Sequence, residues 1–221
     1  MEIPVTAPAL DILYVADALP TADADLAYLT AEVDWIDRMH ARQTASFGSP
    51  YNYSGQQYPA CAMPSIIAAI GDHAATLAGH PFNNCLCNRY ENGSNTMGFH
   101  SDSYDGLVAS SRIAIASFGA SRKLVFRSID KLHRSELVLE HGSILLMTRT
   151  TQLAWTHAIL RDATADRRIS ATFRLFTECL PPHVRESPRD ACPAQGGAGA
   201  TRPQHDPDDD ALRAPRTRGH A

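Results

Sequence analysis

The chain has 221 residues, 44% apolar residues and a formal net charge of −4. This length suffices for one domain with a sizeable core. The absence of any long apolar run or basic leader argues against a membrane protein or a secreted one, and the charge argues against a strong nonspecific nucleic-acid binder. We therefore expect a cytoplasmic monomer that does not contact membranes. The five scattered cysteines argue against a disulfide framework, so Cys85 and Cys87 are interpreted as ordinary buried thiols on a strand.

The N-terminal third predicts two helices among short strands. Residues 1–9 are rich in Pro and Ala and are expected to be flexible. A strand is predicted at 11–15, followed by a helix at 22–35 that Thr21 would cap. Pro64 begins a second helix, which extends to residue 78. Between the helices, residues 42–48 alternate like a strand.

From residue 82 onward the sequence changes to short strands separated by turns. The predicted strands are 84–90, 97–102, 112–118, 122–127, 136–139, 143–148, a strand around 155–157, and 168–176. Gly119-Ala-Ser predicts one hairpin between neighbouring strands, and His141-Gly142 predicts another. The order favours an α+β, mostly β fold, a double-stranded β-helix (jelly roll) with two N-terminal helices that buttress one face. Residues 182–221 are rich in Pro, Gly, Ala and Asp and are expected to be a disordered tail.

A His-x-Asp pair, His100 and Asp102, is the strongest chemical signal in the sequence. Alternate residues of a strand point to the same face, so both side chains can meet at one point. One further histidine would complete a two-His, one-carboxylate set of the kind that holds Fe(II), and His157 is the candidate. The pair alone is weak evidence, because most histidines are surface or core residues.

The last predicted strand places four polar side chains, Arg168, Ser170, Thr172 and Arg174, on one face. That face either lies in water or lines the interior of the jelly roll. In the second case the two guanidiniums need an anionic partner, and a dicarboxylate such as 2-oxoglutarate would supply it. Asn88 and Tyr90 also share a face, with an amide and a phenol as hydrogen-bonding groups.

Taken in order, these motifs resemble the AlkB family of Fe(II)/2-oxoglutarate dioxygenases. The resemblance covers residues 42–176 and rests on Asn88-x-Tyr90, Gly98-x-His100-x-Asp102, the Ser117–Arg122 turn, Gly142–Met147, His157 and Arg168-x-Ser-x-Thr-x-Arg174. It implies that His100, Asp102 and His157 are the Fe(II) ligands. It also implies that 2-oxoglutarate is held by Asn88, Tyr90, Arg168 and Arg174, with Thr172 close by.

The resemblance further implies a domain organisation and an activity. The dioxygenase domain would span 10–181, with a lid over the substrate nucleotide at 34–60 and a jelly-roll core at 82–178. The implied reaction consumes O2 and removes alkyl groups from bases of the 1-methyladenine and 3-methylcytosine type in DNA or RNA. It releases formaldehyde, succinate and CO2.

Several candidate substrate contacts depart from the family pattern or have a structural alternative. Tyr104 stands where repair enzymes of the family carry an acidic residue, and Asp105 is the candidate replacement. Tyr53 is the best-placed aromatic residue to stack on a flipped base, ahead of Trp35, Tyr51 and Tyr58. Each of these could instead pack the lid onto the barrel. Arg42 and Arg122 are candidate phosphate contacts or plain surface residues.

The segment 34–41 is short, which favours single-stranded nucleic acid because no base then needs to be pulled from a stack. Two other functions are compatible with the residues. A 2-oxoglutarate-dependent hydroxylase of a small molecule, peptide or lipid is favoured by the acidic charge and by Tyr104. A non-catalytic binding module is disfavoured by the complete ligand set.

Overall fold

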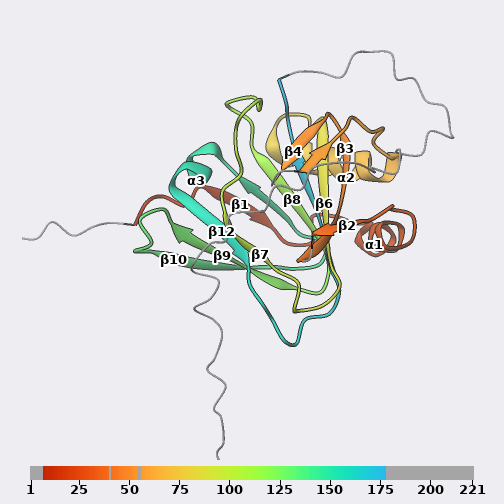
Figure 1. Ribbon diagram of the computed structural model, residues 1–221. Helices are drawn as coiled ribbons and strands as arrows, with labels where there is room; N and C mark the ends of the chain where they lie inside the picture. The colour runs from red at the N-terminus through yellow and green to blue at the C-terminus, as the bar shows by residue number, and fades with distance from the viewer. Residues whose placement is uncertain (1–6, 40, 54–55, 178–221) are drawn as a thin grey trace, which may run out of the picture.

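The computed structural model describes residues 7–39, 41–53 and 56–177, so the predicted tail at 182–221 lies outside the described residues. Two antiparallel sheets face each other, and Figure 1 shows the helices α1 and α2 on the far side of the larger sheet from the smaller one. The predicted jelly roll with buttressing helices is confirmed. Within the described part of the chain, no helix combines the length and apolarity needed to cross a membrane.

The sheets differ in size. The major sheet contains, in spatial order, β1 (Ile12–Val15), β11 (Ile144–Met147), β8 (Ile113–Gly119), β13 (Arg168–Arg174), β6 (Asn84–Tyr90), β3 (Arg42–Gly48) and β2 (Ile36–Met39). The minor sheet contains β10 (Arg134–Leu139), β9 (Arg122–Ser128), β12 (Trp155–Ile159) and β7 (Met97–His100). A separate pair consists of β4 (Tyr51–Tyr53) and β5 (Gln56–Tyr58).

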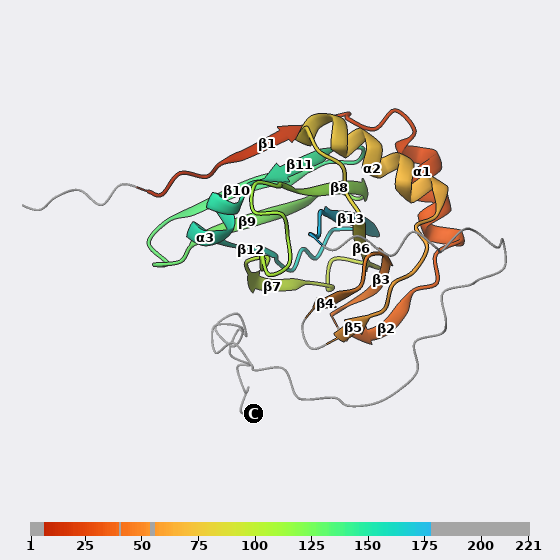
Figure 2. The ribbon, with the colours of Figure 1, turned by 90° about the horizontal axis from the view of Figure 1, so that it is seen from above.

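The helices α1 (Ala22–Ala31) and α2 (Ser65–Ala78) lie side by side on the outer face of the major sheet (Figure 2). Their apolar residues, among them Leu29 and Ile67, enter a core cluster with Ala114 and Phe173 of the sheet. Helix α2 ends where predicted, at a left-handed glycine.

Helix α1 is shorter than the predicted 22–35. The indole Nε1 of Trp35 folds back and donates to the Leu29 carbonyl at 3.1 Å, which satisfies a carbonyl of the last turn. Thr21 is the N-cap residue, as predicted, but its side chain makes no capping hydrogen bond, because its hydroxyl donates to the Asp25 carboxylate at 3.0 Å instead.

Both predicted hairpins are wrong. Strand β8 pairs with β11 and β13 in the major sheet, whereas β9 pairs with β10 and β12 in the minor sheet. The turn at Gly119 therefore carries the chain from one sheet to the other, and the turn at Gly142 carries it back. Gly119 has φ +80°, and a Cβ there would lie 2.5 Å from the Arg167 carbonyl oxygen. These turns mark sheet crossings because β8 and β11, buried almost throughout, belong in the middle of the major sheet.

A third helix, α3 (Arg149–Ala154), was not predicted from the sequence. Thr148 caps it, since its hydroxyl accepts from the Thr151 backbone N–H at 3.4 Å. The helix leads directly into β12 and so fixes the residues that precede His157.

Strand alternation divides the residues of β6 and β13 between the two cores. Cys85 and Cys87 are fully buried in the core between the major sheet and the helices, with their sulfurs 3.7 Å apart, as ordinary thiols. The intervening residues of these strands face the space between the sheets. The polar face of β13 therefore lines the interior and does not lie in water.

Candidate metal and co-substrate site

The space between the two sheets holds a pocket that is partly open to solvent. It is walled by β6 and β13 on one side and by β7, β9 and β12 on the other. The polar side chains that line it are Asn88, Tyr90, His100, Asp102, His157, Arg168, Ser170, Thr172 and Arg174. Every residue predicted for the iron and for 2-oxoglutarate thus lines one pocket.

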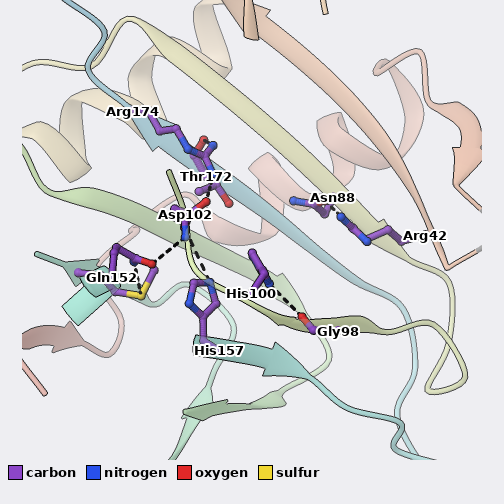
Figure 3. A network of polar contacts seen from close by, with 10 residues as sticks. Arg42, Asn88, Gly98, His100, Asp102, Gln152, His157, Thr172 and Arg174 are labelled. Carbon is purple, nitrogen blue, oxygen red and sulfur yellow. Dashed lines mark hydrogen bonds and ion pairs between the residues drawn. The ribbon is translucent and has the colours of Figure 1, made fainter. Parts of the chain in front are cut away.

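The three predicted metal ligands lie together at the C-terminal end of strand β7. His100 lies directly opposite His157 in the β7–β12 register, and Asp102 follows two residues after the end of β7. Their ligand atoms all lie within 4.8 Å of one another. The Nε2 of His157 is 3.8 Å from Oδ2 of Asp102, as Figure 3 shows. This distance is too long for a hydrogen bond, but two ligand atoms each about 2.1 Å from one ion can span it.

The protonation states suit a divalent cation. Burial and the neighbouring His100 lower the pKa of His157 to about 3, and burial lowers the pKa of His100. Burial raises the pKa of the Asp102 carboxyl, but the Arg174 guanidinium outweighs this effect and holds it well below its usual range. At neutral pH the pocket therefore presents two neutral imidazoles and one carboxylate, the forms that bind Fe(II).

Neighbouring groups hold two of the ligands in place. The Nδ1 of His100 donates to the Gly98 carbonyl at 2.9 Å, which leaves Nε2 to face the pocket. Arg174 Nη2 donates to Oδ1 of Asp102 at 2.6 Å. The backbone N–H of Asp102 donates to Oε1 of Gln152 at 2.9 Å (Figure 3). Gln152 was not singled out in the sequence, where only the Thr148 capping signal pointed to its helix.

Arg168 is a buried cation that has no anionic partner among the residues that the structure describes. Its side chain is 1% exposed, and it donates to the Ser117 hydroxyl at 3.0 Å. Its guanidinium carbon lies 5.4 Å from the centre of the Tyr90 ring. Burial lowers its pKa, but a guanidinium stays charged in proteins. Among the described residues no carboxylate forms an ion pair with it, and its Nε has no hydrogen-bond partner. A buried charge in this state calls for an anionic ligand, and a dicarboxylate fits.

The sequence profile of the 2OG-Fe(II) oxygenase superfamily matches residues 28–174. The chain belongs to this superfamily. Human DNA oxidative demethylase ALKBH2 is 33% identical over 158 residues, which are 65% of this chain and 60% of that protein. Rat alpha-ketoglutarate-dependent dioxygenase alkB homolog 3 is 30% identical over 177 residues, which are 71% of this chain and 60% of that one. The chain thus spans about 60% of the length of these two relatives.

A solved structure, "The structure of OsALKBH1", shares the fold with a TM-score of 0.57 at 14% identity and covers 78% of this chain and 100% of that one. This likeness supports the jelly-roll fold, and the sequence likeness to ALKBH2 and to alkB homolog 3 confirms the AlkB family that the motifs predicted.

Fe(II), 2-oxoglutarate and O2 are the cofactors of this 2OG-Fe(II) oxygenase, and the residues fit them. His100, Asp102 and His157 would hold the iron. Asn88, Tyr90, Arg168 and Arg174 would hold the co-substrate, with Thr172 close by, and Arg174 also pairs with Asp102. When bound, iron and 2-oxoglutarate supply the activation of O2 that protein side chains cannot perform.

The candidate substrate residues of this AlkB-family protein have diverse environments. Tyr104 is half-buried and donates to the Ser111 carbonyl at 3.1 Å; burial and the Asp102 charge raise its pKa to about 12. Asp105 is exposed and accepts from the Ser103 hydroxyl at 2.8 Å. Arg42 is only 7% exposed, and its Nε donates to Oδ1 of Asn88 at 2.8 Å, so it supports a residue that lines the pocket. The side chain of Tyr53 lies outside the described residues.

Other candidates prove to be packing residues. Arg122 is neither a phosphate contact nor a surface residue, because it is 2% exposed and donates to the Asn95 and Leu160 carbonyls. Tyr58 is buried against Thr44. The packing alternative given for Tyr58 thus agrees with its burial, whereas Arg122 was misjudged because sequence alone does not reveal which polar groups end up covered.

Proposed function

We propose that this AlkB-family protein is a dioxygenase that removes N-alkyl groups from nucleobases of the 1-methyladenine and 3-methylcytosine type in DNA or RNA. The observation that carries the proposal is that the two-His, one-carboxylate set and the unpaired Arg168 cation line the same pocket. The names of the two relatives, a DNA oxidative demethylase and an alpha-ketoglutarate-dependent dioxygenase, support the choice of reaction.

The chain's own residues bind the co-substrate, orient the metal ligands and exclude water. Arg168 anchors a carboxylate of 2-oxoglutarate in the pocket, and Arg174 orients the Asp102 carboxylate. Apolar side chains of both sheets, including Leu86, Ile115 and Leu124, line the same pocket and reduce the access of water. Oxidation of an N-methyl carbon gives a hemiaminal, which collapses to formaldehyde and the unmodified base, while 2-oxoglutarate yields succinate and CO2.

We further propose a preference for single strands. Strand β2 pairs directly with β3 over a very short connection, with Met39 opposite Arg42. A connection of this length offers no long hairpin to insert into a duplex, so a base that is already unstacked is the more accessible substrate.

Matched oligonucleotides test both proposals. Formaldehyde and the repaired base are measured with 1-methyladenine and 3-methylcytosine, each in single-stranded and fully paired DNA and RNA. We expect repair to be faster on single strands. Repair of duplex alone would refute the strand preference. Succinate formation coupled to a small molecule, peptide or lipid, with no repair of any oligonucleotide, would replace the demethylase with the hydroxylase alternative.

A further inference from the structure

A buried glutamine on helix α3, Gln152, hydrogen-bonds the backbone of Asp102, the predicted carboxylate ligand of the metal site. Gln152 is 4% exposed, and its Oε1 accepts from the backbone N–H of Asp102 at 2.9 Å. Its Nε2 lies 3.5 Å from the sulfur of Met147 on β11, which settles which end of the amide faces Asp102. Figure 3 shows Gln152 on the side of Asp102 that faces away from Arg174.

Asp102 needs such a contact because of where it lies. Strand β7 ends at His100, and β7 is the edge strand of the minor sheet. The ladder that aligns His100 with His157 therefore stops before Asp102, whose backbone belongs to the loop at 101–112. A buried amide N–H without a partner costs about 1–3 kcal/mol, so the acceptor from α3 favours one placement of this residue.

The continuous segment of α3 and β12 helps to position two of the predicted metal ligands, Asp102 and His157. Gln152 stands on α3 and His157 on β12, which follows α3 without a break. His157 is aligned by the sheet, and Asp102 is aligned by Gln152. The neutral amide suits the position, because a charged carboxylate beside Asp102 would add like charge to a buried site. A carboxyl group placed there would stay protonated for the same reason, and its carbonyl oxygen could still accept from the Asp102 N–H.

We propose that Gln152 is a positioning residue, which holds Asp102 ready for the metal before the metal binds. The inference rests on the metal site and is independent of the substrate proposed above. Contacts of this kind behind a ligand change metal affinity by about 10- to 100-fold in other proteins.

Three variants separate positioning from simple packing. Gln152→Met keeps the length of the side chain but removes the amide oxygen. Gln152→Glu restores an acceptor oxygen at the same reach. Thr151→Val is the matched control, since Thr151 is buried on the same helix and its hydroxyl donates to the Asp11 carbonyl, away from the metal site.

Co(II) is titrated into the metal-free full-length protein in the absence of 2-oxoglutarate and substrate. Binding is measured from the visible absorption of the bound Co(II). We expect Gln152→Met to weaken Co(II) binding by about 10-fold or more, Gln152→Glu to recover much of the loss, and Thr151→Val to stay within about threefold of the parent.

Hydrogen exchange of the Asp102 amide should also accelerate in Gln152→Met. Unchanged Co(II) affinity in Gln152→Met, or an equal loss in Thr151→Val, would overturn the proposal. If Gln152→Met does not fold, the exchange rate of the Asp102 amide in Gln152→Glu decides, with Thr151→Val as the control. A rate equal to or slower than that of the parent supports positioning, and a faster rate in Gln152→Glu with an unchanged rate in Thr151→Val overturns it.

Discussion

Arg174 joins the terminal strand to the metal site through a buried ion pair with Asp102. Nη2 of Arg174 lies 2.6 Å from Oδ1 of Asp102, and both side chains are 3% exposed. The guanidinium carbon also lies 4.7 Å from the centre of the Tyr51 ring on β4. One cation therefore connects the carboxylate ligand with the small β4–β5 sheet.

Removing that cation should leave Asp102 charged and uncompensated. We expect Arg174→Met to destabilise the metal-free protein by about 3–5 kcal/mol in urea unfolding, because breaking one side of a buried pair exposes its desolvation cost. Asp102→Asn combined with Arg174→Met should cost less than the sum of the two single changes. Strictly additive losses would show that the pair contributes no coupling.

The metal ligands are tested by single replacements. His100→Ala, Asp102→Ala and His157→Ala should each abolish 2-oxoglutarate turnover and weaken Co(II) binding, since each removes one donor of a set of three. His73→Ala, an exposed histidine on α2, is the control and should behave like the parent. Turnover retained in any of the three variants would remove that residue from the ligand set.

Arg168 should control the affinity for 2-oxoglutarate. A charged hydrogen bond contributes about 1.5–3 kcal/mol, so Arg168→Met should raise the dissociation constant of 2-oxoglutarate by about 10- to 100-fold, as measured by calorimetry with Mn(II) present. Arg134→Met, which alters an exposed arginine paired with Glu136, is the control. An unchanged constant in Arg168→Met would place the co-substrate elsewhere.

The depressed pKa of His157 predicts how stability depends on pH. The unfolded chain takes up a proton near pH 6.5, whereas the folded site resists protonation down to about pH 3. The stability of the metal-free protein is therefore fully present above about pH 6.5 and is lost as pH falls from there toward 3. His157→Gln removes this titration and should flatten the curve of unfolding free energy against pH between 7.5 and 4.5. Parallel curves would contradict the assignment; a residual slope is expected from His100, whose pKa shifts in the same direction.

Arg122 should act on stability and not on binding. Its guanidinium ties Asn95 of one loop to Leu160 of another. Arg122→Leu should lower the urea midpoint while leaving the salt dependence of oligonucleotide binding unchanged. A reduced salt slope would instead restore the phosphate contact that the sequence suggested.

The sequence alone determined the local alternations and, from them, the chemistry. Residues an even number of positions apart on one strand share a face whatever the rest of the chain does, so Asn88 with Tyr90 on β6, and Arg168 with Arg174 on β13, could be grouped correctly. The same alternation predicted that His100 and Asp102 lie together, but strand β7 ends at His100, so only the loop that follows places Asp102. The jelly roll follows from many short strands after two amphipathic helices.

Only the tertiary structure decided what each strand pairs with and what each polar group touches. The local sequence at Gly119 and Gly142 predicted hairpin turns between neighbouring strands. Because β8 is buried on both faces, it pairs inside the major sheet, and each turn connects the two sheets instead. Gln152 reaches Asp102 from fifty residues away in sequence, and Arg42 and Arg122 become buried through partners on other elements. Such contacts depend on the summed burial of distant segments, which no local pattern of residues records.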